Sequence, residues 1–163
     1  LMQSSQTLAI IMKNVLQILL IMLPLFSNAQ FDFEDKDWEK KTIGFGCGAG
    51  GSMTDLTLDF HFLFSAKDFN GIKEKLNSKI AGEKFLASFI LEKLEKKKEL
   101  DLSESELKKI DEIKMLTEIV PVCSGCTYWE TVALNELWNK KHPIYKSAES
   151  WFKFYYKMNY KNK

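Results

Sequence analysis

The spacing of apolar side chains in the middle of the chain most constrains what it can fold into. A first short helix, for which Asp68 is a good N-cap residue, has its apolar positions on one face: Phe69, Ile72 and Leu76. A second helix, expected over residues 81–97, has a wider apolar face: Phe85, Leu86, Phe89, Ile90 and Leu94. Neither helix is long enough to be stable alone in water. Both must therefore pack against the rest of the chain.

Capping patterns predict three further helices towards the C-terminus. The first begins at the capping box Ser103-x-x-Glu106, the second at Thr127-x-x-Glu130, and the third at Ser147. We expect the second of these to run to about residue 140 and the third to continue to residue 160. Helices would then fill most of the chain after residue 100.

Residues 53–64 fit two structures. A capping pattern at Ser52-x-x-Asp55 and the apolar spacing after it predict a helix, whereas the strict alternation of apolar residues fits a half-buried strand. The local cap and the neighbouring helices favour the helix. The expected fold is mainly α: a small bundle or stack of helical hairpins with an N-terminal glycine-rich loop.

The N-terminal part, residues 1–29, has the pattern of a secretory signal. A short basic start, Met12-Lys13-Asn14, precedes an apolar core over residues 15–26, and small residues at 27–29 predict cleavage before Gln30. The apolar core is too short for a membrane anchor, which needs about 20 residues. Translation would start at Met2 or Met12. We expect an exported protein, periplasmic or secreted, with an arm and glycine-rich loop over residues 30–52 and a helical domain over residues 53–163.

The glycine-rich loop has five glycines between Gly44 and Gly51, after a short segment that could be extended. It contains Gly46-x-Gly48-x-x-Gly51, which matches a dinucleotide-binding pattern. That pattern binds dinucleotides only between a strand and a helix of a parallel βαβ unit, and no second parallel strand is evident downstream. We therefore expect no cofactor, and a loop that docks Cys47 against the body of the protein.

Three cysteines, Cys47, Cys123 and Cys126, form the one set of residues with a clear chemical potential. An exported chain meets oxidants, so two of the three are expected to pair. A disulfide from Cys47 to either Cys123 or Cys126 would close a loop of about 75 residues and stabilise the fold by about 4 kcal/mol in the chain-entropy model. This structural role is the favoured interpretation.

Two alternatives use the same cysteines. Cys123-Ser124-Gly125-Cys126 is a CxxC before an expected helix N-terminus, where a thiolate is stabilised. Cys123 and Cys126 could therefore alternate between dithiol and disulfide, with Cys47 as the resolving cysteine. The strand-helix context of thioredoxin-type enzymes is missing. Alternatively, the three thiolates with His142 or His61 could form a Cys₃His zinc site. A Cys/His nucleophile pair has no supporting motif.

The last expected helix is rich in aromatic residues, and Lys153 and Lys157 lie among them. Most of these rings should dock on the core. The residues we expect to contact a protein partner are Trp151, Phe154 and Tyr155. A helix with aromatic and cationic side chains can also contact a membrane surface.

Charge composition argues against nucleic-acid binding. The chain has no arginine and a formal net charge of +1. Nucleic-acid-binding proteins normally carry a basic excess, and bidentate recognition of phosphate or guanine depends on arginine.

Two resemblances bear on these expectations. The segment EKFLASFILEKL, residues 83–94, resembles the second helix of a HEAT-type repeat, which implies stacked helical hairpins and no particular activity. The CSGCT turn, the early GCG loop and the helical middle together resemble small exported bacterial proteins of uncharacterised activity. We therefore expect an exported helical interaction or structural module that is stabilised by a disulfide and has no catalytic activity.

Overall fold

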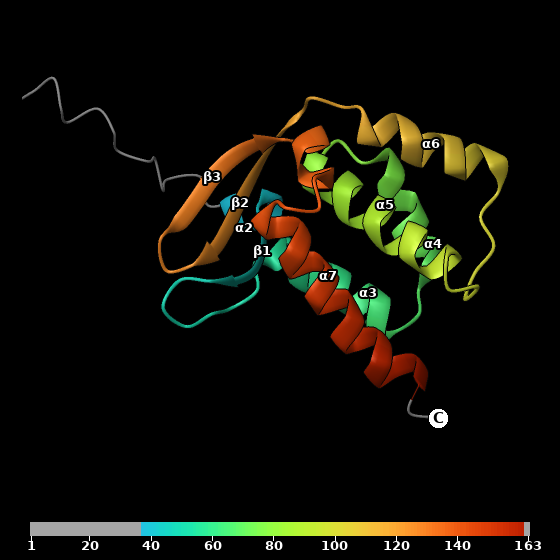
Figure 1. Ribbon diagram of the computed structural model, residues 1–163, viewed down its shortest axis with the longest axis horizontal. Helices are drawn as coiled ribbons and strands as arrows, with labels where there is room; N and C mark the ends of the chain where they lie inside the picture. Colours follow the sequence, from blue (N-terminus) through green and yellow to red (C-terminus); the bar gives the residue numbers. More distant parts are fainter. Residues whose placement is uncertain (1–36, 162–163) are drawn as a thin grey trace, which may run out of the picture. The chain divides into compact units, whose positions relative to one another are not determined.

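The computed structural model describes residues 37–161 (Figure 1). Its regular elements are, in chain order, α2 (Trp38–Lys41), β1 (Ile43–Cys47), α3 (Asp55–Ser65), α4 (Phe69–Glu74), α5 (Ala81–Glu95), α6 (Glu104–Lys114), β2 (Ile119–Gly125), β3 (Tyr128–Ala133) and α7 (Pro143–Tyr156). Short 3₁₀ segments cover Lys75–Asn77 and Leu134–Trp138, and a π-helical turn, Lys157–Lys161, continues α7.

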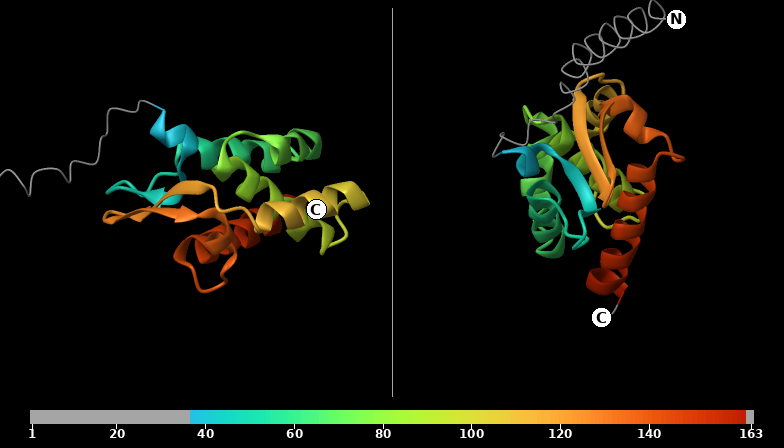
Figure 2. Two further views of the ribbon diagram at one scale, coloured as in Figure 1. Left: turned by 90° about the horizontal axis from the view of Figure 1, so that it is seen from above. Right: turned by 90° about the vertical axis from the view of Figure 1, so that its left-hand side faces the viewer.

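The fold is mixed α/β, so the expectation of a mainly α bundle of helical hairpins is wrong. Within residues 37–161, six helices accompany a three-stranded sheet of order β1-β2-β3. β1 pairs with β2 in parallel, and β2 pairs with β3 in an antiparallel hairpin. The strands lie side by side at one end of the described part, and α3, α5 and α7 extend away from them (Figures 1 and 2). A parallel pair needs a long crossover connection, and the segment from α3 to α6 supplies it.

The prediction that fails most clearly is the helix from Thr127 to about residue 140. Thr127-x-x-Glu130 does not cap a helix, because Tyr128–Ala133 is β3 and only Leu134–Trp138 is helical, as a 3₁₀ segment. The hairpin turns at Gly125, whose φ of 62° suits glycine. β-branched and aromatic side chains on both sides of a Gly-containing turn are the pattern of a hairpin, and this pattern outweighs the capping box.

Other helix predictions are confirmed. Asp68 caps α4 by accepting a hydrogen bond from the Gly71 amide, and Ser103 and Glu106 form a complete capping box on α6. Residues 55–65 are helical as favoured, but the predicted cap at Ser52 is wrong: Thr54 is at the N-cap, and its side chain makes no capping hydrogen bond. The last helix starts earlier than predicted from Ser147. Pro143 occupies its first turn, where a missing amide hydrogen costs nothing.

The central element is α5, the wide-faced helix expected from the sequence. Ten of its 15 residues are buried, among them Phe85, Phe89 and Leu94. Gly82 lets the first turn of α5 approach β1 closely, since a Cβ there would lie 3.0 Å from the Lys41 carbonyl oxygen and 3.3 Å from the Ile43 side chain. The apolar spacing therefore identified the helix around which the domain packs.

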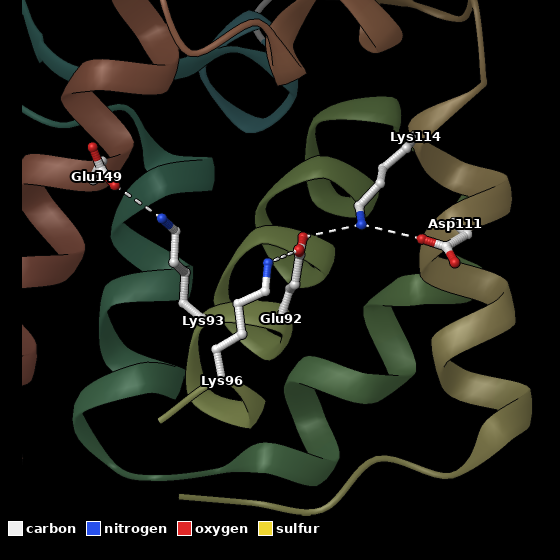
Figure 3. A network of polar contacts seen from close by, with 6 residues as sticks. All are labelled: Glu92, Lys93, Lys96, Asp111, Lys114 and Glu149. Atoms are coloured by element: carbon white, nitrogen blue, oxygen red, sulfur yellow. Dashed lines mark hydrogen bonds and ion pairs between the residues drawn. The ribbon is translucent and has the colours of Figure 1, made fainter. Parts of the chain in front are cut away.

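Ion pairs attach α5 to the helices on both sides of it (Figure 3). Lys93 Nζ lies 2.9 Å from Glu149 Oε1 on α7, and Lys114 Nζ on α6 lies 3.1 Å from Glu92 Oε2. Burial raises the pKa of Glu92, but its hydrogen bonds with Lys96 and Lys114 outweigh burial, and the net pKa is lowered. Opposite charges thus hold α6 and α7 in register on α5.

The secretory-signal prediction, with its cleavage before Gln30, lies outside the described residues. Among residues 37–161, no helix combines the length and apolar character needed to cross a bilayer.

Candidate functional site

The disulfide joins Cys47, at the end of β1, to Cys123 in β2. Their Cα atoms are 5.7 Å apart, within the usual range for a disulfide. Of the two pairings left open by the sequence, the structure has Cys47–Cys123, and the structural-disulfide prediction is confirmed. Because β1 and β2 are the parallel pair, the bond links two strands that are 76 residues apart in sequence.

Gly44 makes room for this disulfide. It is the register partner of Cys123, and a Cβ on Gly44 would overlap the Sγ atoms of both Cys47 and Cys123. It would also lie 2.9 Å from Cγ2 of Thr54. A side chain at position 44 and the disulfide cannot both fit without a shift of the backbone.

A buried set of threonines fixes the backbone around Gly44. The Gly44 amide donates to Thr57 Oγ1 over 3.1 Å, and Thr54 Oγ1 donates to the Thr42 carbonyl over 2.6 Å. The two hydroxyls of Thr54 and Thr57 lie 3.1 Å apart, and all three threonines are buried. These bonds join the first turn of α3 to the outer edge of β1. Sequence reasoning missed them, because the threonines come into contact only after the chain has turned back at the glycine loop.

Cys126, three residues after the disulfide-bonded Cys123, is an exposed free thiol. Its Sγ lies 3.6 Å from the Gly48 carbonyl, and the Gly48 amide donates to the Gly125 carbonyl over 3.0 Å. The CxxC motif is therefore divided: Cys123 is bonded to Cys47, and Cys126 lies in the hairpin turn rather than at a helix N-terminus. This pairing does not support a Cys123–Cys126 redox cycle.

The zinc interpretation is not supported by the donor set. Cys47 and Cys123 are joined to each other and are not available as thiolates. His142 is at the N-cap of α7, where its Nδ1 accepts a hydrogen bond from the Ile144 amide over 3.2 Å. In the described part of the chain, no group of three or more His, Cys, Asp or Glu side chains could hold a metal ion.

The GxGxxG segment forms a tight turn rather than a phosphate cradle. The expectation that no second parallel strand follows the loop is wrong, because β2 is parallel to β1. The backbone nevertheless folds back at this loop, with hydrogen bonds in both directions between Cys47 and Ser52. The amides of Gly48 and Gly51 also donate to carbonyl oxygens, of Gly125 and Gly48 respectively. The amides that would face a pyrophosphate are largely occupied.

A shallow groove of about 430 Å³ lies where the ends of β1 and β2 meet α7. We call it the aromatic groove. It is lined by Phe45, Gly46, Met53, Ser124, Ser147, Ser150, Trp151, Phe154 and Tyr155. None of these side chains is charged, and the polar ones are three serines and the tips of Trp151 and Tyr155. The groove therefore offers apolar and aromatic contact with a few hydroxyl groups.

The three predicted partner-binding residues all line this groove, but they differ in exposure. Trp151 is buried, with 7% of its surface exposed, and its ring packs on Phe45 at a centroid distance of 5.7 Å. Tyr155 is half-buried, whereas Phe154 is 59% exposed. Trp151 thus belongs largely to the core, and Phe154 is the member of the set that can contact a partner directly.

His61, one of the two histidines considered as a zinc ligand, is half-buried. Its ring lies 4.3 Å from the ring of Tyr155, and its Nδ1 is buried without a hydrogen-bond partner. Trp151 Nε1 is likewise buried and unpaired. His61 therefore forms part of the contact between α3 and α7.

Comparisons with protein-family models, with curated proteins and with solved structures give no match.

Proposed function

We propose that this chain is an exported binding module without catalytic activity, which recognises a protein segment in the aromatic groove. The observation that carries the proposal is the groove itself: an uncharged, aromatic hollow beside the exposed Phe154. Exposed apolar surface rimmed by polar groups marks interaction sites. The groove is open and shallow, whereas pockets for small molecules enclose most of the ligand surface.

Export is supported by two separate features. The n-region, apolar core and small residues of positions 12–29 have the order of a secretory signal. The Cys47–Cys123 bond is of a kind that forms and persists in oxidising compartments. Mass spectrometry of the mature protein tests this directly. We expect a chain that begins at Gln30, with one disulfide and one free thiol.

The binding proposal is tested by photo-crosslinking in the cell that makes the protein. A benzophenone amino acid at Ser147, inside the groove, should crosslink to a protein other than a second copy of this chain. The same group at Met115, which is 78% exposed at the end of α6, serves as the matched control and should not crosslink. Met53→Lys, which places a charge in the groove, should abolish the Ser147 crosslink. Equal crosslinking from both positions, or none from Ser147, would contradict the proposal.

A further inference from the structure

An apolar strip runs across α3 and α7 beside the groove. Its members are large side chains that remain exposed: Leu58 at 36%, Phe62 at 61%, Phe154 at 59% and Met158 at 51%. Ring contacts connect the two helices beneath it, from Phe62 to His61 at 5.7 Å, His61 to Tyr155 at 4.3 Å, and Tyr155 to Phe154 at 5.0 Å. We call these four exposed residues the α3–α7 strip. Contiguous exposed apolar surface of this kind usually marks a contact site.

The α7 side of the strip is bordered by lysines. Residues of an α-helix follow one another at about 100°. Going around α7 from Tyr155, which faces α3, the next exposed side chains are Phe154 and Met158, the latter in the π-helical turn that continues α7. The exposed residues beyond them are Ser150 and the three lysines Lys157, Lys146 and Lys153. Glu149 is the one acidic residue of α7, and it is paired with Lys93 and Lys153.

The α3 side of the strip is bordered by acids. Going around α3 from His61, which faces α7, the next exposed side chains are Leu58 and Phe62, followed by Asp55 and Asp59. From α7 to α3, the surface therefore carries three zones in order: the lysines, the apolar strip and the aspartates. Among the described residues, Lys146, Lys157 and Asp59 form no ion pair, so their charges remain available.

We propose that a second copy of this chain covers the α3–α7 strip and forms a two-fold symmetric dimer. In such a dimer the same patch is used twice and must be complementary to itself. A two-fold axis that passes through the strip and runs parallel to α3 and α7 stacks apolar residues on apolar residues. It also places the lysine border of each copy opposite the aspartate border of the other. If both borders carried lysines, like charges would face each other across the interface. Here one border is basic and the other is acidic, so opposite charges face each other. The proposal goes beyond the binding function of the groove. The strip and the groove share Phe154, so a second copy and a segment bound in the groove would compete for this side chain.

The test uses two oppositely charged variants of the full mature chain. Lys146→Glu/Lys157→Glu makes both borders acidic, and Asp55→Lys/Asp59→Lys makes both borders basic. Each variant alone should be a monomer, because like charges then face each other across the interface. An equimolar mixture should form a heterodimer, because each acidic border then meets a basic one. Circular dichroism and thermal melting confirm that both variants are folded.

Sedimentation velocity at about 100 µM provides the measurement, since a dimer with a Kd of about 1 µM is then mostly associated. We expect the wild-type protein to be a dimer and Phe62→Ser to weaken it by about 30-fold, as for an interface anchor. Met115→Ser, on α6, is the matched control and should leave the dimer unchanged.

A monomeric wild type would overturn the proposal. So would a dimer that survives both charge reversals, or a mixture of the two variants that stays monomeric. Met53→Lys distinguishes this proposal from the groove function, because Met53 lines the groove and lies outside the strip. In Met53→Lys, the Ser147 crosslink should be lost while the dimer remains intact.

Discussion

Removal of the Cys47–Cys123 disulfide should destabilise the protein strongly. The bond closes a loop with a sequence separation of 76 residues. In the chain-entropy model, a loop of this length restricts the unfolded chain by an amount equivalent to about 4.5 kcal/mol at 25 °C. A domain of this size has a total stability of roughly 6–20 kcal/mol. The disulfide therefore contributes between about a quarter and three quarters of the free energy of unfolding.

The double variant Cys47→Ala/Cys123→Ala measures this contribution. Alanine at both positions avoids leaving a buried hydroxyl or thiol in the place of Cys123, which is fully buried. With a urea m-value of about 1.5 kcal/mol/M, the unfolding midpoint should fall by about 3 M. The m-value should also rise, because the unfolded chain without its crosslink exposes more surface. Cys126→Ala is the matched control and should change stability by less than about 0.5 kcal/mol, as expected for an exposed position.

Two results would refute the reasoning. If the double variant lost less than about 1 kcal/mol, the chain-entropy account of this bond would fail. If Cys126→Ala destabilised the protein as much as the double variant, peptide mapping should show Cys126 in the native disulfide, and the observed pairing would be wrong.

Further predictions concern Gly44, the threonines, Glu149 and Tyr160. Gly44→Ala should impair disulfide formation. The free energy of unfolding that it removes should be smaller in the Cys47→Ala/Cys123→Ala background, and a double-mutant cycle in urea would measure the difference. Thr57→Val should cost about 1–3 kcal/mol, because it leaves the buried Gly44 amide unpaired; Thr57→Ser should retain most of the stability in the same assay. The hydrogen bond from Lys93 lowers the pKa of Glu149 below 4.5, so the stability from this pair is present above about pH 4.5 and is lost as the pH falls through the lowered pKa. Glu149→Gln should flatten that part of a stability–pH curve, and an unchanged curve would exclude the pair as its source. Burial raises the pKa of Tyr160 from 10.0 to about 12, so its contribution to stability is lost between those values as the pH rises. The pKa of Tyr128 is raised to about 12 as well, so ultraviolet titration of Tyr160→Phe should show one late-ionising tyrosine fewer than the wild type.

Local signals predicted the helices well and the sheet poorly. A cap such as Asp68 or Ser103 acts within one turn of helix, so the residues that decide the structure are adjacent in the sequence. The pairing of β1 with β2 depends on residues more than 70 positions apart, and no local pattern reports it. The Thr127-x-x-Glu130 capping pattern predicted a helix that does not form, because Tyr128–Ala133 pairs with β2 as a strand instead.

The candidate site was predictable in part for the same reason. The expectation of export, together with three cysteines, predicted a disulfide from Cys47 to the CxxC, and the structure has Cys47 bonded to Cys123. The aromatic side of the groove was also found, because Trp151, Phe154 and Tyr155 lie on one helix. Its other wall comes from β1 and β2 and required the three-dimensional structure.

The disulfide and the groove are parts of one arrangement. Phe45 and Gly46 directly precede Cys47 on β1, and Ser124 directly follows Cys123 on β2, so the covalent bond holds together the two strands that form one wall of the groove. The other wall, α7, is attached to α5 by Lys93 and Glu149 (Figure 3). Reduction should therefore loosen the strand wall and leave the attachment of α7 unchanged. Binding in the groove should weaken under reducing conditions in which the helices are still folded. A partner that binds reduced and oxidised protein equally would show that the groove does not depend on the disulfide.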